Sequence, residues 1–252
     1  MEQQNFQYKE QSVFVGQEKS VSKRFFANVF LWMFVALGIS TVAAYIFGTT
    51  PEFMEMLRKP DLVTGAYKTT ILGYAVMFSP LALVLLMSAG LSRLSFPALV
   101  GIFILYSALT GMSLSFVLQV FTTYSIITCF AAAAGIFGIM AFLGYTTDID
   151  LSKFGPILMV GVVGLVIASL INMFVQSAQF SLIMAYAGIA IFTALTAYDV
   201  QNIKRIGMGI EQAGDEVLTV DAKKMAIMGA LRLYLDFLNI FLYLLQIFGS
   251  RK

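Results

Sequence analysis

Long stretches without a single charged residue are the feature that most constrains this chain. Four such runs, at residues 25–51, 69–92, 94–147 and 154–198, are 27, 24, 54 and 45 residues long. A helix that crosses a bilayer needs about 20 apolar residues. The first two runs therefore hold one crossing helix each. The other two hold a pair each, divided at residues 121–125 and 176–179. Residues 225–250, in which only Arg232 and Asp236 are charged, form a seventh candidate.

The overall composition agrees with a membrane protein. Hydrophobic residues make up 59% of the chain and charged residues 12%, about half the ~25% that is usual in soluble domains. The alternation of apolar and polar residues that marks a membrane β-barrel is absent. We therefore predict an all-α membrane protein with one transmembrane domain at residues 25–250, preceded by a disordered cytoplasmic tail at residues 1–24. The predicted helices span about residues 25–47, 70–91, 97–120, 125–145, 155–175, 180–204 and 225–250.

The basic residues predict the orientation of the helices. Ten of them fall in the tail and in the loops on the same side: Lys9, Lys19, Lys23, Arg24, Arg93, Lys153, Lys204, Arg205, Lys223 and Lys224. Three fall in the first loop of the opposite side: Arg58, Lys59 and Lys68. Loops rich in Lys and Arg stay in the cytoplasm. The N-terminus is therefore predicted to be cytoplasmic.

The scarcity of cysteine and histidine excludes several kinds of site. The chain has one Cys, Cys129, and no His. Zinc sites, Cys–His nucleophiles and Ser–His–Asp triads are therefore unavailable. The net charge of +2 gives no reason to expect a nucleic-acid partner, and no motif indicates a cofactor. A response to pH near neutrality would have to come from carboxylates rather than from imidazole.

Two aspartates within the apolar runs are the candidate functional residues. A charge inside the hydrocarbon region costs roughly 2.5–3.5 kcal/mol on insertion scales, so such residues usually serve pairing, ion handling or proton handling. Asp199 lies ~7 Å inside the Lys204 end of its helix at ~1.5 Å per residue. If Arg232 marks the corresponding boundary, Asp236 lies ~6 Å inside and the depths match. If Lys224 marks the boundary, Asp236 lies ~18 Å deep and the match fails.

Two carboxylates at similar depth predict a specific chemistry. Carboxyl groups in contact share a proton and titrate as a unit. When both are ionised, they attract a hard cation such as calcium, which prefers oxygen ligands. Protons and calcium then compete for the same oxygens. Asp199 and Asp236 are therefore candidate ligands of a transient calcium site that responds to pH.

Simpler explanations exist for each polar residue. Arg232 lies four residues before Asp236, the spacing of an ion pair within one helix. Asp199 is explained equally by an interfacial position beside the basic residues that follow it. Asn239 either adds an oxygen to the site or bridges two helices. The acidic loop that contains Asp150 is predicted to be a solvated turn.

Four motifs give the chain a family resemblance. They are YSALTG at residues 106–111, GYTT at 144–147, TAYDVQNIK at 196–204 and GALRLYLDFLNIF at 229–241. With these motifs the chain resembles the Bax inhibitor-1 family, most closely its bacterial inner-membrane branch. The resemblance covers nearly the whole chain after Ser20. It implies seven helices with the last one central, wrapped by the other six.

The resemblance also implies a function. The family's activity is a pH-sensitive calcium leak, and its two gating aspartates fall on Asp199 and Asp236. A basic residue at the end of the second helix pairs with the first of these aspartates in better-described members, and Arg93 is the candidate here. Position 232 is usually small and uncharged in the family, so Arg232 is a departure and a second possible charge partner.

Two alternative functions compete with a leak. Bacterial relatives are associated with a membrane-bound ATP-dependent protease, so the chain is alternatively a regulator of such a protease that transports nothing. Intramembrane aspartyl proteases also use two aspartates on their sixth and seventh helices. They require Gly-x-Gly-Asp at the second aspartate, however, whereas this chain has Leu233, Tyr234 and Leu235 before Asp236. The chain is therefore not expected to be an enzyme.

Overall fold

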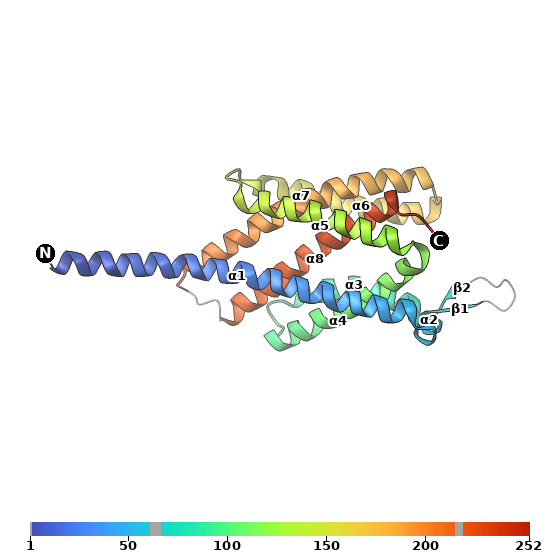
Figure 1. Ribbon diagram of the computed structural model, residues 1–252, viewed down its shortest axis with the longest axis horizontal. Coiled ribbons are helices and arrows are strands. Elements are labelled where there is room, and N and C mark those ends of the chain that lie inside the picture. Colours follow the sequence, from blue (N-terminus) through green and yellow to red (C-terminus); the bar gives the residue numbers. More distant parts are fainter. Residues whose placement is uncertain (1, 61–66, 215–218) are drawn as a thin grey trace.

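The computed structural model describes the backbone at residues 2–60, 67–214 and 219–252, and the side chains in these ranges from Val21 onward except that of Pro60. Most of the chain is helical (Figure 1). In chain order the elements are α1 (Glu2–Thr49), α2 (Pro51–Leu57), β1 (Arg58–Pro60), β2 (Tyr67–Thr69), α3 (Ile71–Gly90), α4 (Phe96–Val120), α5 (Thr123–Thr146), the short 3-10 helix η1 (Leu151–Phe154), α6 (Gly155–Val175), α7 (Ala178–Gln212) and α8 (Val220–Phe248).

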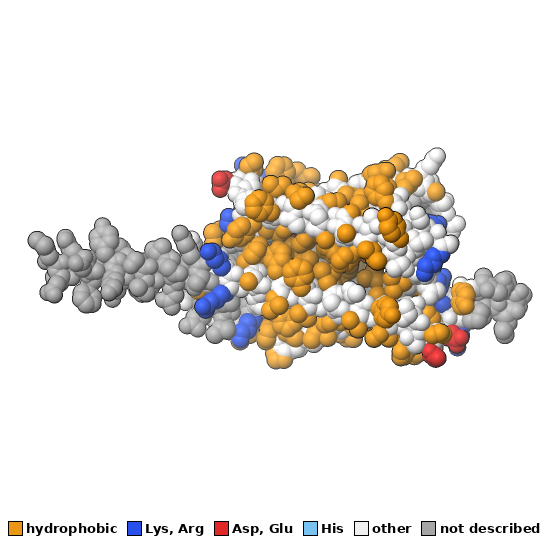
Figure 2. Space-filling view, viewed as in Figure 1, with side chains coloured by type: hydrophobic (Ala, Val, Ile, Leu, Met, Phe, Trp, Pro, Cys, Tyr) orange, Lys and Arg blue, Asp and Glu red, His pale blue; other side chains and the backbone are white. Residues whose placement is uncertain are grey.

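Within the described residues, seven helices are long and apolar enough to cross a membrane. They are the Val21–Thr49 part of α1, then α3, α4 and α5, the Leu151–Val175 segment of η1 and α6, and finally α7 and α8. Apolar side chains cover the middle of the molecule, and lysines and arginines gather at its two ends (Figure 2). The prediction of an all-α bundle with seven spans is therefore confirmed.

Several observed helix bounds lie within three residues of the predicted ones. Apart from the start of α1, the largest differences concern the last two helices. α7 continues to Gln212, eight residues beyond the predicted end at 204, and α8 begins at Val220 rather than at 225. The prediction ended the sixth membrane helix where the basic residues begin. A helix has no reason to stop there, because its backbone bonds are internal on either side of the membrane surface.

The N-terminal segment precedes the first membrane span. Residues 1–24 are predicted to form a disordered tail, and the backbone from Glu2 belongs to α1, which ends at Thr49. Residue 1 and the side chains before Val21 lie outside the described part of the structure, so disorder of the tail stays a prediction, as does its cytoplasmic location.

Hydroxyl side chains begin most of the membrane helices. The first backbone N–H groups of a helix have no partner within it and need an acceptor. Thr70, Ser95, Thr122, Ser177 and Thr219 supply this acceptor at the starts of α3, α4, α5, α7 and α8. The paired runs are divided where the sequence predicts, at Phe121–Thr122 between α4 and α5 and at Gln176–Ser177 between α6 and α7.

α8 is the central helix, as predicted. In its most apolar window 67% of the residues are buried within the protein, against at most 39% in any other span of the described chain. α8 packs directly on α1, α4, α5 and α7. α3 lies outside α4, and α6 lies outside α7 with 6% of its window buried. The last helix therefore faces protein, whereas α6 faces lipid.

α8 crosses the whole bundle and does not turn back. The two termini lie at opposite ends of the molecule (Figure 1). We call these ends the N-terminal end and the C-terminal end of the bundle. Past α8, the chain is fixed to the turn between α4 and α5: the Thr122 N–H donates to the Ser250 carbonyl and the Lys252 N–H donates to the Val120 carbonyl. Residues 249–252 therefore pack against the turn between α4 and α5 at the C-terminal end of the bundle.

Candidate functional site

The antiparallel pair of α7 and α8 brings the two predicted aspartates together. Asp199 lies 13 residues before Gln212, the end of α7, and Asp236 lies 16 residues after Val220, the start of α8. At ~1.5 Å per residue these separations correspond to ~20 Å and ~24 Å from the same connection. The two carboxyl groups consequently lie close enough to interact electrostatically. The two distances match although α8 starts well before Arg232, because α7 also continues well past Lys204.

Both carboxyl groups are buried in the apolar interior. Asp199 is 7% exposed and Asp236 is 3% exposed. Among the described residues, the Oδ2 atom of Asp236 is buried and has no hydrogen-bond partner. A buried polar atom without a partner is costly and usually marks a functional constraint. The pair therefore presents an oxygen that the protein itself does not satisfy.

Arg232 contacts the pair from the edge. Its Nη1 atom lies 3.9 Å from Oδ1 of Asp199, and its side chain is 52% exposed. That distance is an ion pair but exceeds hydrogen-bond length. The arginine therefore reaches across to α7, although it also acts electrostatically on Asp236 of its own helix. Two ionised carboxylates and one guanidinium leave a net charge of −1 in the apolar core, which a proton or a cation can neutralise.

The other basic residues near α7 have different partners. The Nζ atom of Lys204 donates to the Tyr145 carbonyl at 2.8 Å and also lies over the Tyr145 ring. Arg205 forms an ion pair with Asp150. Lys204 therefore contacts the last turn of α5, and Arg205 contacts the loop that follows it. Asp199 therefore does not take its counter-charge from the basic residues that follow it.

Within the described chain, Arg93 and Asn239 form no hydrogen bond or ion pair with either carboxyl group. Arg93 is exposed in the connection from α3 to α4, and within the described chain no ion pair joins it to either aspartate. The side-chain amide of Asn239 donates to the Leu235 carbonyl at 2.8 Å within α8. Asn239 also lines a cavity of about 620 Å³ beside Tyr106 and Tyr243. Only Arg232 of the predicted partners meets the aspartates in this structure.

Gln201, two residues after Asp199, fixes the loop after α5 to α7. Its Nε2 atom donates to the Ile149 carbonyl at 2.7 Å, and its Oε1 atom accepts from the Leu151 N–H at 2.8 Å. Oε1 also accepts from Arg205 at 2.7 Å. We call this arrangement of Ile149, Asp150, Leu151, Gln201 and Arg205 the loop clasp. Sequence analysis missed it because the loop and α7 are about fifty positions apart and share no local pattern.

Asp150 takes part in the loop clasp rather than lying in a merely solvated turn. Its carboxylate accepts from the hydroxyl and the N–H of Ser152, the second residue of η1, and pairs with Arg205. The Ser152 hydroxyl and the Arg205 guanidinium hold the pKa of Asp150 well below its usual range. The carboxylate is therefore ionised throughout the physiological pH range, and the ion pair persists with it.

Glycines in the first two motifs mark close helix crossings. A Cβ atom on Gly144 of α5 would collide with the backbone of Ala197, two residues before Asp199 on α7. A Cβ atom on Gly111 of α4 would collide with the backbone of Ser40 on α1. Small residues allow membrane helices to approach at such points. The GYTT motif therefore holds α5 against the part of α7 that carries Asp199.

The ligand set sets a limit on calcium binding. No group of three or more Asp, Glu, His or Cys side chains lies together among the residues that the structure describes. Calcium takes six to eight oxygen ligands at high-affinity sites. The carboxylates of Asp199 and Asp236 fit the ion's preference for oxygen but supply only part of this number. The two carboxylates alone therefore do not make a high-affinity calcium site.

Comparison with known proteins places the chain in one family. The family model described as "Inhibitor of apoptosis-promoting Bax1" matches residues 22–252. The inner membrane protein YbhL of Escherichia coli (strain K12) is 37% identical over 238 residues, which cover 94% of this chain and 96% of the relative. An uncharacterized protein of Deinococcus radiodurans is 35% identical over 244 residues, covering 96% and 97%. The chain is an integral membrane protein with seven candidate spans and a central last helix. Together with these relatives, it belongs to the Bax inhibitor-1 family.

Proposed function

We propose that this protein is a pH-sensitive calcium leak of the bacterial inner membrane, gated by Asp199 and Asp236. The observation that carries the proposal is the pair itself: two almost completely buried carboxyl groups that interact electrostatically, with one oxygen unsatisfied and one half-exposed arginine beside them. A purely structural ion pair would match its charges and satisfy its atoms. The excess of negative charge instead suits a site that exchanges protons and cations.

The proposed gate depends on competition for the carboxylate oxygens. In the closed state, Arg232 and a shared proton neutralise the pair. Loss of the proton leaves negative charge in the apolar core, and a calcium ion entering from water then supplies the missing charge. A fully protonated pair binds cations poorly, so flux is expected to depend on pH as a window rather than as a simple rise.

The exposed position of Arg232 supports this exchange. A guanidinium that is 52% exposed and 3.9 Å from Asp199 can move into water at little cost. Its departure would open the approach to Asp199 from the N-terminal end of the bundle. We expect this end to face the cytoplasm because the loops at that end carry most of the basic residues.

The proposal involves no catalysis. Leu233 and Tyr234, which precede Asp236, are both fully buried. Such bulk leaves no room for a peptide backbone beside the carboxyl group. The alternative of an intramembrane protease is therefore less well supported than a leak.

Calcium flux into liposomes tests the proposal. Purified protein in vesicles loaded with a calcium indicator should pass more calcium than empty vesicles within about pH 5 to 8, where groups tuned around neutrality change charge. Asp236→Asn and Asp199→Asn should each flatten the pH profile. Asp221→Asn is the matched control, because Asp221 is an exposed aspartate in the first turn of the same helix α8. Flux equal to that of empty vesicles at every pH would refute the leak.

A further inference from the structure

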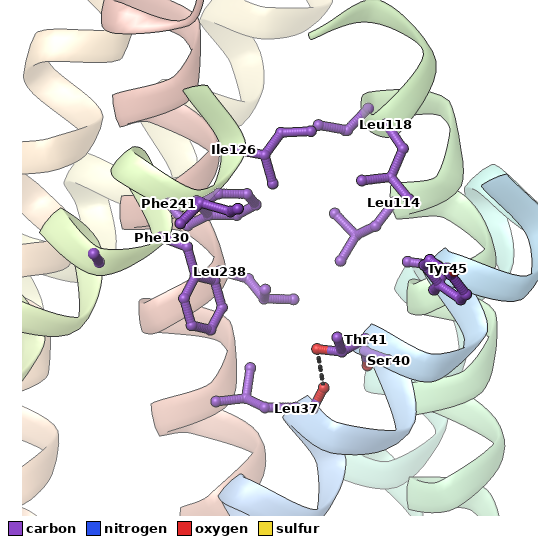
Figure 3. Close-up of a pocket in the computed structure, with 14 residues that line it drawn as sticks. Leu37, Ser40, Thr41, Tyr45, Leu114, Leu118, Ile126, Phe130, Leu238 and Phe241 are labelled. Carbon is purple, nitrogen blue, oxygen red and sulfur yellow. Dashed lines mark hydrogen bonds between the residues drawn. The ribbon is translucent and has the colours of Figure 1, made fainter. Parts of the chain in front are cut away.

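A second site lies away from the aspartates, in a cavity of about 460 Å³ between α1, α4, α5 and α8. The α1–α4 pair forms one wall, α5 forms the other, and α8 forms the back. Figure 3 shows side chains from all four helices directed at this space, among them Leu37, Thr41, Leu118, Phe130, Leu238 and Phe241. We propose that this cavity binds one acyl chain of a bilayer phospholipid.

The hydroxyl groups of Ser40 and Thr41 in the lining already have hydrogen-bond partners. The Ser40 hydroxyl donates to the Ser107 carbonyl at 2.7 Å and accepts from the Tyr234 hydroxyl at 2.6 Å. The Thr41 hydroxyl donates to the Leu37 carbonyl at 2.8 Å. The remaining lining is almost entirely aliphatic and aromatic. An apolar cavity with satisfied hydroxyls favours a hydrocarbon over water.

The mouth of the cavity opens within the apolar surface. Tyr45 on α1 and Ile127 on α5 line opposite walls and are 66% and 64% exposed. Leu238 at the back is 7% exposed. A chain that enters between the two walls therefore comes directly from the surrounding bilayer and reaches α8 without crossing a polar layer.

The cavity has the position and length of an acyl chain in one leaflet. Along α1 its lining runs from Leu37 to Tyr45, which is ~12 Å at ~1.5 Å per residue. One leaflet contributes about half of the ~30 Å hydrocarbon core. Leu118 and Ile126 lie within one turn of the α4–α5 connection. The cavity therefore starts near the membrane surface at the C-terminal end and runs toward the middle of the bilayer.

Basic side chains lie where the lipid phosphate would be. The Lys252 Nζ atom donates to the carbonyl of Leu118, itself a lining residue, at 2.7 Å. The backbone of Arg251 forms a β-bridge with Phe121 in the adjacent turn, and the side chains of Arg251 and Lys252 are exposed. Lysine and arginine near the membrane surface attract lipid phosphate. This charge favours a phospholipid over a free hydrocarbon as the occupant, and the proposal does not depend on calcium transport.

Photolabelling tests the proposal directly. The full-length protein is reconstituted in vesicles of phosphatidylethanolamine and phosphatidylglycerol that include a phospholipid with a diazirine in the middle of one acyl chain. Leu238 should be labelled, although it is buried, because the chain reaches it through the cavity. Val163 on α6, which is 55% exposed, should be labelled as an ordinary lipid-facing residue, whereas Ile240, 0% exposed on α8, should not. Labelling of Val163 without Leu238 would overturn the proposal.

Filling the cavity supplies the matched variants. Ala131 lines the cavity and is exposed, so Ala131→Trp places a large ring in the mouth without disturbing the interior. Label at Leu238 should be lost in this variant. Ala132→Trp puts the same ring one residue along α5, at an exposed position outside the lining, and should keep the label. Equal labelling of Leu238 in both variants would contradict entry through the cavity.

A second probe identifies the source of the acyl chain. A diacylglycerol with the same diazirine has the same acyl chains but no phosphate, so it should label Leu238 less than the phospholipid does at equal membrane concentration, and replacing Arg251 and Lys252 with Ala should remove this difference. Labelling of Leu238 by the diacylglycerol alone would show an acyl-chain site that does not take phospholipid, and would overturn the assignment.

Discussion

Arg232 makes its ion pair with Asp199 on the neighbouring helix, although Asp236 is one turn away on its own helix. The Nη1–Oδ1 distance is 3.9 Å. The arginine therefore couples α7 to α8 rather than stabilising α8 alone. It supplies one positive charge beside two buried carboxylates, and this imbalance of charge leads to the first two predictions.

Removing the guanidinium should move the pH window of the proposed leak. In Arg232→Ala the negative form of the pair loses its nearby positive charge, so a higher pH is needed to open the site. An ion pair with an exposed partner contributes about 0.2–1 kcal/mol, and one pH unit corresponds to about 1.4 kcal/mol, so the shift should be about half a unit. Calcium flux against pH measures it. An Arg93→Ala variant should keep the wild-type profile. A shift in Arg93→Ala, with none in Arg232→Ala, would show that Arg93 rather than Arg232 supplies the counter-charge.

Neutralising the buried pair should stabilise the fold while it impairs flux. Asp236→Asn keeps the shape of the side chain and removes a charge that lacks full compensation. The expected gain is about 1–3 kcal/mol in the free energy of unfolding, the typical cost of an unsatisfied buried group. It should grow as pH rises, because the wild-type pair then carries more charge. Thermal unfolding in detergent at several pH values measures the gain, and a lower stability of Asp236→Asn at high pH would contradict the interpretation.

The loop clasp should hold the loop after α5 in place. Gln201→Ala removes three hydrogen bonds in a largely buried position. We expect faster hydrogen exchange at Leu151 and a loss of about 1–3 kcal/mol in stability. Asn202→Ala is the control, because the Asn202 side chain is only partly buried and makes no hydrogen bond within the described chain. Unchanged exchange in Gln201→Ala would show that the clasp is not what orders the loop.

The contribution of Asp150 to the loop clasp should depend on pH in a known direction. Its pKa is depressed in the folded protein, so the stabilisation is complete above the ordinary carboxylate value of about 4 and is lost as the pH falls below it. A spin label at Ile149→Cys, in a Cys129→Ser background without other cysteines, should become mobile only in acid. Asp150→Asn should be mobile at neutral pH as well. Mobility that is low in both proteins at neutral pH would be inconsistent with the ion pair as the restraint.

Gly144 should tolerate no side chain. Gly144→Ala places a methyl group against the Ala197 backbone and separates α5 from α7, with an expected cost of about 1–3 kcal/mol. Gly138→Ala, on the same helix, has open space around the new methyl group and should be neutral or gain up to about 1 kcal/mol from helix propensity. The two variants are compared by thermal unfolding. Equal stabilities would mean that the helices shift apart without cost.

The arrangement of the helices follows from the sequence more directly than the contacts of the site do. Charge-free runs of sufficient length leave the backbone no stable alternative to crossing helices. The central position of α8 came from the family resemblance, since the two charges within its apolar run do not by themselves distinguish an inner helix from an outer one. The pairing of Asp199 with Asp236 was predicted from similar depths below Lys204 and Arg232 and from the resemblance. In the structure both helices extend past these residues, and the aspartates match because they lie at similar distances from the connection of α7 and α8.

Contacts between distant segments could not be predicted. The i, i+4 spacing of Arg232 and Asp236 is compatible with a pair on one helix, but the direction of a long flexible side chain depends on the neighbouring helix. Arg93 was a candidate from the resemblance alone, and no contact in the described structure joins it to the pair. Gln201 has no local partner, so only the folded chain shows that it binds the loop 52 positions away.

The central position of α8 has a consequence for biogenesis. α1 packs on both α4 and α7, α5 and α6 pack on α7, and α8 contacts α1, α4, α5 and α7. α8 follows the other six spans in the chain, so it is synthesised after them. Until α8 is made, the surrounding helices have no protein partner for the faces that α8 covers. Completion of the fold and creation of the aspartate pair are then a single event, and a chain that stalls before α8 has neither.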